Sequence, residues 1–208
     1  MLSKLPYARI LLAVVGVVEM DQEDCMALVQ PLLTRWHDGW HYAHDLYRSY
    51  PPELSADHDD STAAACVRRH MWVWLQNNLM SIPGVNFLSA GETRQLDLLN
   101  YQDRAVVRFK KVDSAGRHSN FLTGQQGDFD REKPLPGIPP EAVRLTCGYE
   151  PAPSGEAIRR VIVARVFGPS VLWASQVNVV DDAAAWEDIT PARIAGTNRI
   201  QERPRKAG

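Results

Sequence analysis

The chain has 208 residues, of which 45% are hydrophobic and 23% are charged, and its formal net charge at pH 7 is −2. These values are typical of a globular domain and exclude disorder over most of the chain, which requires low hydrophobicity and a large net charge. The slight acidity also disfavours a protein that coats nucleic acid with its whole surface, although it is compatible with a local basic patch.

The apolar run at residues 10–18 is the first notable segment, and it is too short to span a bilayer, which needs about 20 residues. Acidic residues follow it, whereas a signal peptide would end in a small-residue cleavage site. The run is therefore a strand or short helix on the core, or else translation starts at Met20 and residues 1–19 are not native. The cysteines Cys25, Cys66 and Cys147 are odd in number and far apart, which predicts reduced thiols in a cytoplasmic protein without a membrane segment.

Residues 22–48 are predicted to form the first helix, with Asp21 as its N-cap. Pro31 lies inside this span and predicts a kink or a break. Trp36 and Trp40 belong to an apolar stripe at helical spacing.

Residues 57–80 are predicted to form a second helix, which ends at the Ile82-Pro83-Gly84 sequence. Val67, Met71 and Trp74 share one of its faces. We expect the two helices to pack on each other, with these three side chains meeting Trp36 and Trp40.

Beyond residue 85 the pattern changes to short β-rich runs separated by turn residues. The expected fold class is α+β, with an N-terminal helical pair (about 20–80) packed on a C-terminal antiparallel sheet (about 85–180), within one domain at 1–190. Residues 113–140 are expected to be a loop, and 191–208 a frayed basic tail. The strands are expected near residues 85–89, 94–100, 104–112, 142–149, 157–167 and 170–178.

A histidine-rich face on the first helix is the first candidate site. His37 and His41 have the i, i+4 spacing of helical metal ligands, with His44 one turn further, and His70 faces them if the helices form a hairpin. We expect no cofactor. The alternative is a zinc or other divalent metal ion bound by His37, His41 and His70.

The strand near residues 104–112 and the turn after it form the second candidate site. Alternation places Val107 and Phe109 on the buried face and Arg108 and Lys110 on the open one. We expect this open face to bind phosphate or an acidic partner surface; the alternative is an ordinary solvated outer face. The candidate binding residues are Arg104, Arg108, Lys110, Arg117, His118 and Asn120.

The same strands match a restriction-type nuclease site only in part. Such a site needs an Asp on one strand and an acid two residues before a Lys on the next. Asp97 and Lys110 match in part, but Arg108 stands where the second acid should be, so only a variant site that uses Glu92 and Asp97 remains.

Several strings in the chain, namely YRSYPPEL, HDDSTAAACVRRHM, VVRFKKVD, GRHSNFLTGQQ, LPGIPP and VRLTCGY, resemble a little-characterised bacterial family. The resemblance covers about residues 30–178. Members of this family are often encoded beside an Xre-type helix-turn-helix repressor that carries an ImmA/IrrE-type zinc-peptidase domain. The resemblance implies a component of a toxin–antitoxin or phage-defence pair but no defined activity.

The expected function is therefore a toxin-type effector controlled by a partner protein, with an Xre/ImmA-IrrE-type regulator as the suspected partner. The first alternative is an enzyme, with or without a metal, that acts on nucleic acid or nucleotides. The second is a binding module without catalysis.

Overall fold

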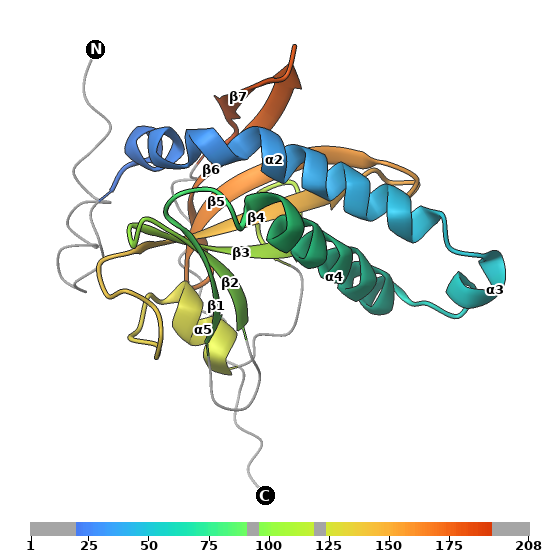
Figure 1. Cartoon of the computed structure of the whole chain (residues 1–208), viewed down its shortest axis with the longest axis horizontal. Coiled ribbons are helices and arrows are strands. Elements are labelled where there is room, and N and C mark those ends of the chain that lie inside the picture. The colour runs from blue at the N-terminus through green and yellow to red at the C-terminus, as the bar shows by residue number, and fades with distance from the viewer. Residues whose placement is uncertain (1–19, 91–95, 119–123, 193–208) are drawn as a thin grey trace, which may run out of the picture.

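The computed structural model describes residues 20–90, 96–118 and 124–192, which form an α+β domain (Figure 1). Helices α2 and α4 run side by side, with α3 at the turn between them, and they cover one face of a sheet. The helices are α2 (Gln22–Arg48), α3 (Pro52–Ser55), α4 (Asp60–Leu79) and α5 (Gly124–Asp130), and the strands are β1 (Val85–Ala90), β2 (Leu96–Tyr101), β3 (Ala105–Lys111), β4 (Val143–Pro151), β5 (Ile158–Phe167), β6 (Ser170–Val180) and β7 (Ala183–Asp188).

The seven strands lie in chain order within one sheet. All neighbours are antiparallel except β3 and β4, which are parallel. The expectation of a purely antiparallel sheet was therefore wrong, because the long connection after β3 carries the chain back before β4 begins. The connection contains α5, which the sequence analysis placed within a loop. Strand β7 was not predicted from the sequence. It follows a turn where Asp181 and Asp182 adopt positive φ angles of 50° and 62°.

Both long helices begin at an aspartate cap. Asp21 accepts a hydrogen bond from the backbone N–H of Asp24 at 2.9 Å, and Asp59 accepts one from Thr62 at 2.7 Å. α4 therefore begins at Asp60 rather than at residue 57. α2 continues through Pro31 without a break, because the buried residues on either side hold both halves on the sheet.

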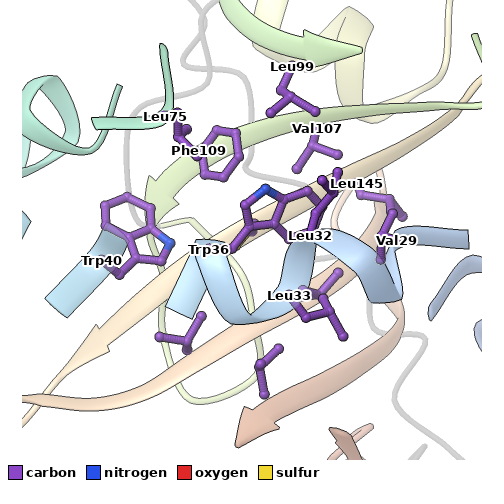
Figure 2. Close-up of a cluster of buried hydrophobic side chains, with 14 of the residues drawn as sticks. Val29, Leu32, Leu33, Trp36, Trp40, Leu75, Leu99, Val107, Phe109 and Leu145 are labelled. Carbon is purple, nitrogen blue, oxygen red and sulfur yellow. The ribbon is translucent and has the colours of Figure 1, made fainter. Parts of the chain in front are cut away.

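The main core lies between the sheet and the two long helices (Figure 2). Trp36 and Trp40 are fully buried, but their ring neighbours belong to the sheet. Trp36 meets Phe109 edge-on with ring centroids 5.8 Å apart, and Trp40 lies 4.8 Å from Tyr149. The helices do pack on each other, as expected, but the tryptophans of α2 point mainly to the sheet.

The contact between α2 and α4 passes through a glycine. A Cβ atom at Gly39 would lie 2.7 Å from Trp74 Cε3 and 2.8 Å from Met71 Sδ. The absence of a side chain at Gly39 therefore lets the two helices approach closely, and Met71 and Trp74 take part in the helix contact as expected.

The opposite face of the sheet is covered as well. A smaller apolar cluster lies there, formed by Leu98, Val106, Phe129, Ile138 and Ala142. Three of its members, Phe129, Ile138 and Ala142, belong to the connection between β3 and β4. This connection therefore covers the face that the sequence analysis expected to be open.

Within residues 20–90, 96–118 and 124–192, every helix is too short or too polar to span a lipid bilayer. The apolar run at residues 10–18 and the tail from residue 193 lie outside the described residues.

Candidate functional site

The side chains of β3 alternate as predicted, but the face that carries Arg108 is not open. Val107 and Phe109 join the core beneath the helices, whereas Val106 and Arg108 point to the other side. Arg108 is only 2% exposed. The expectation of a solvent-exposed Arg108 was wrong, because alternation assigns a face to a residue but does not show what covers that face.

Arg108 and His118 meet at one carboxylate, that of Asp130. Arg108 donates from Nη2 to Asp130 Oδ1 and from Nε to Thr146 Oγ1, the latter at 2.8 Å. His118 Nε2 lies 3.0 Å from Asp130 Oδ2. We call Arg108, His118, Asp130 and Thr146 the Asp130 cluster. All four side chains are almost fully buried, so Arg108 and His118 contact the Asp130 carboxylate away from solvent.

Phe129 lies between two arginines of neighbouring strands. The guanidinium carbon of Arg108 is 4.9 Å from the centre of the Phe129 ring, and that of Arg144 is 5.4 Å from it. Guanidinium groups bind to aromatic faces through the ring quadrupole. The last turn of α5 is therefore held by stacking and by the ion pair at Asp130.

Arg144 also binds the backbone at the end of α5. Its Nη1 donates to the carbonyl oxygens of Asp128 and Phe129 at 3.0 and 3.2 Å, and its Nη2 donates to that of Lys133. The carbonyls of Asp128 and Phe129 lie at the negative end of α5, where a cation is favoured. The backbone N–H groups of Lys133 and Glu132 already donate to the Asp128 and Phe129 carbonyls, and Arg144 adds a charged donor to each.

Arg165 and Glu132 fasten the chain just beyond α5. Arg165 donates from Nε and Nη2 to Glu132 Oε1 at 3.1 and 3.0 Å, and from Nη1 to the carbonyl oxygen of Met20 at 2.9 Å. Burial raises the pKa of Glu132, and Arg165 opposes that rise. The acidic segment 128–132 is therefore attached to three adjacent strands, through Arg108 of β3, Arg144 of β4 and Arg165 of β5.

Lys110 and Arg108 both have a lowered pKa near the cluster. Burial is the main cause that lowers the pKa of Lys110 to about 8, and the charges of Arg68 and Arg108 lower it further. Burial also lowers the pKa of Arg108, although Asp130 opposes the change. Shifted lysines of this kind are a common feature of functional sites, although structural ion networks produce them too.

The structure gathers only part of the predicted phosphate site. Arg108, Lys110 and His118 lie around Asp130, whereas Arg104 and Arg117 are exposed in separate turns. Asn120 lies outside the described residues. Asp130 was not predicted as a site residue. Its only sequence indication is the acid–aromatic–acid pattern DFD, which lies in a stretch interpreted as a loop.

The histidines of α2 do not meet His70. Gly39 faces α4, and His37 and His41 are each two positions from Gly39, on nearly the opposite side of a helix with 3.6 residues per turn. Their rings lie 4.5 Å apart, whereas His70 forms a 2.6 Å hydrogen bond with the hydroxyl of Tyr50. No group of three His, Cys, Asp or Glu side chains suited to a metal was found within the described ranges.

The carboxylate of the nuclease hypothesis has another partner. Asp97 accepts a hydrogen bond from Arg68 Nη1 of α4 at 3.2 Å. Glu92, the second acid of that hypothesis, lies outside the described residues.

A hollow of about 300 Å³ opens on the outer face of α2 and α4. We call it the helix hollow. Two of its lining residues, Tyr42 and Val73, are 50% and 40% exposed and place apolar surface at its opening. Its lining residues are Tyr42, Leu46, His70, Val73, Trp74, Asn77 and Asn78.

Comparison of the chain with protein-family models, with curated proteins and with solved structures found no match.

Proposed function

We propose that this chain is the toxin-type effector of a bacterial toxin–antitoxin or phage-defence pair, and that a partner protein controls it by binding at the helix hollow. The resemblance of the strings between residues 30 and 178 supports the kind of pair. The exposed apolar rim of the helix hollow is the observation that supports the partner surface. A cytoplasmic location belongs to the same proposal, and the free cysteines Cys25, Cys66 and Cys147 are consistent with it.

The lining of the helix hollow favours a protein partner over a phosphorylated ligand. It contains no carboxylate, lysine or arginine. Burial lowers the pKa of His70, so its imidazole is neutral at pH 7. A phosphate group would find no cation there, whereas an uncharged side chain would meet two aromatic rings and two amides.

The size of the helix hollow points in the same direction. Its volume of about 300 Å³ is at the lower end for a small-molecule site and is sufficient for one bulky side chain. Binding energy at protein interfaces is concentrated in a few such anchors, which are surrounded by polar contacts. The partner would therefore insert one aromatic or large aliphatic side chain between α2 and α4.

The test uses the protein encoded beside this chain, which we expect to be an Xre/ImmA-IrrE-type regulator. The pair is co-expressed and analysed by size-exclusion chromatography, and cell growth is followed with each protein alone and with both. Val73→Asp should remove the complex and restore the growth defect in the presence of the partner. Val180→Asp is the matched control, because Val180 is 67% exposed at the end of β6 and should leave the complex intact. A stable complex with Val73→Asp would contradict the proposed surface.

A second candidate function is an enzyme that acts on nucleic acid or nucleotides, with or without a metal. The observation that favours it is the lowered pKa of Lys110 beside the Asp130 cluster. Lys110→Met should then remove toxicity without loss of the fold, and metal analysis of the purified protein would show whether an ion takes part. If Lys110→Met remains toxic and the partner complex still forms, a binding module without catalysis is the better description.

A further inference from the structure

The face of the sheet opposite α2 carries two arginines that are arranged diagonally on neighbouring strands. Val106 of β3 pairs with Arg144 of β4, and Arg108 pairs with Thr146, so both guanidinium groups arise from the same face. Lys110 follows at the next position of β3 on that face. The sheet therefore presents a row of cations beneath the 128–132 segment.

The segment Asp128-Phe129-Asp130 contacts the two arginines through an aromatic ring, a carboxylate and a carbonyl oxygen. The ring of Phe129 lies against both guanidinium groups, at 4.9 and 5.4 Å. The carboxylate of Asp130 pairs with Arg108, and the carbonyl oxygen of Asp128 accepts from Arg144. Single-stranded nucleic acid presents the same alternation, since its bases stack on arginine and aromatic planes while its phosphates pair with cations.

We infer that this face of the sheet is a binding surface for single-stranded nucleic acid, and that residues 128–132 occupy it as an internal mimic of a nucleotide. The cations that would receive the backbone and bases are Arg108, Arg144 and Lys110. Displacement of the segment exposes them, and the segment competes with any nucleic acid for the same contacts. This inference concerns the opposite side of the molecule from the helix hollow and does not depend on it.

Two features of the contact between residues 128–132 and the sheet indicate that another ligand could displace this segment. Arg108 Nη1 and His118 Nδ1 are buried without a hydrogen-bond partner in the part of the chain that the structure describes. Such atoms are costly, so the segment does not satisfy the polar groups that it covers. A buried ion pair is also a poor means of stabilisation, because apolar residues of similar volume often stabilise a fold more.

The segment is also packed by fewer apolar residues than the main core. Within the described residues, the cluster that includes Phe129 has five buried members, whereas the cluster beneath α2 and α4 has 27. Elements with few buried apolar contacts open at a lower free-energy cost than the rest of a domain. The cover can therefore open while the main core stays folded.

The test measures binding of a fluorescein-labelled oligouridylate of about 20 nucleotides by fluorescence anisotropy. Asp130→Asn keeps the shape of the side chain but removes the charge that competes for Arg108. We expect this variant to bind the probe at least roughly 10-fold more tightly than the wild type, with an affinity that falls as salt is raised. Glu156→Gln is the control, because it makes the same charge change at an exposed turn residue and should bind like the wild type.

A further variant assigns the gain to the proposed surface. Addition of Arg108→Met to Asp130→Asn should abolish the gain, since the freed guanidinium is then absent. Circular dichroism and a cooperative thermal transition must show that each variant is folded. A folded Asp130→Asn variant that binds no more tightly than the wild type overturns the inference.

If Asp130→Asn does not fold, hydrogen exchange of the wild type tests whether nucleic acid displaces residues 128–132. Saturating oligouridylate should accelerate exchange of the α5 amides, because the probe displaces the segment, while the amides of α2 keep their rates. Unchanged exchange in α5, or no binding of the probe by the wild type, would overturn the inference in that case.

Discussion

The guanidinium of Arg108 and the carboxylate of Asp130 form a buried ion pair that joins β3 to the last residue of α5, with side chains 3% and 2% exposed. The two residues are 22 positions apart in the chain. The sequence of β3 is typical of a strand with one solvated face. In the structure, helices cover one face of β3 and the β3–β4 connection covers the other.

Replacement of Arg108 should therefore destabilise the protein. Arg108→Ser leaves the carboxylate of Asp130 buried with only His118 beside it, and loss of one partner of a buried pair costs about 3–5 kcal/mol. An Arg108 on an exposed face, as alternation alone suggested, would be replaced at almost no cost in stability. Urea unfolding of Arg108→Ser and Arg117→Ser separates the two expectations, since Arg117 is exposed and its loss should change the free energy of unfolding by less than about 0.5 kcal/mol.

A side chain at Gly39 should force α2 and α4 apart. The added methyl group of Gly39→Ala would overlap the ring of Trp74 and the sulfur of Met71, and such overpacking costs about 1–3 kcal/mol. Gly124→Ala is the matched control, because a Cβ atom there meets nothing within 4 Å. Thermal unfolding should show a lower midpoint for Gly39→Ala only, and equal midpoints would show that the helices can separate without cost.

Removal of the Trp40 ring should be among the most damaging single changes. The ring is fully buried and contacts Tyr149 and Phe109, so Trp40→Ala should lower the free energy of unfolding by roughly 3–5 kcal/mol. Trp186 of β7 is only partly buried, and Trp186→Ala should cost clearly less. A loss of less than about 1 kcal/mol for Trp40→Ala would contradict the packing of α2 on the sheet.

Lys110 should make stability depend on pH in a defined window. Its pKa is about 8 in the folded chain, against an ordinary value of 10.5. Between these values the unfolded chain binds a proton that the folded chain has released, so the free energy of unfolding rises with pH. The penalty from burial of the charge is fully present below pH 8 and disappears above pH 10.5.

The comparison with Lys110→Met isolates this contribution, because other titrating groups are common to both proteins. The stability of the wild type relative to Lys110→Met should increase as pH rises from 8 to 10. Lys133→Met, which changes an ammonium group with a 57% exposed side chain, should show no such trend. A pH-independent difference for Lys110→Met would show that Lys110 is solvated in the folded protein.

Periodicity and end signals predicted the elements that local chemistry controls. The apolar stripe that contains Trp36 and Trp40 identified α2, and Asp21 marked where that helix starts. Alternation along β3 separated Val107 and Phe109 from Arg108 correctly. These features depend on neighbours within about one helical turn or one strand, so the sequence by itself determines them.

The candidate site depends on contacts between distant parts of the chain. Residues 124–142 return across the sheet, make β3 and β4 parallel neighbours and bring Asp130 to Arg108 and His118. His37 and His70, in contrast, lie on helices that pack together but point in different directions. Alternation and helical spacing predict which side chains share a face. The tertiary structure determines what covers that face, because a charged group can be buried only where a distant part of the chain supplies its partner.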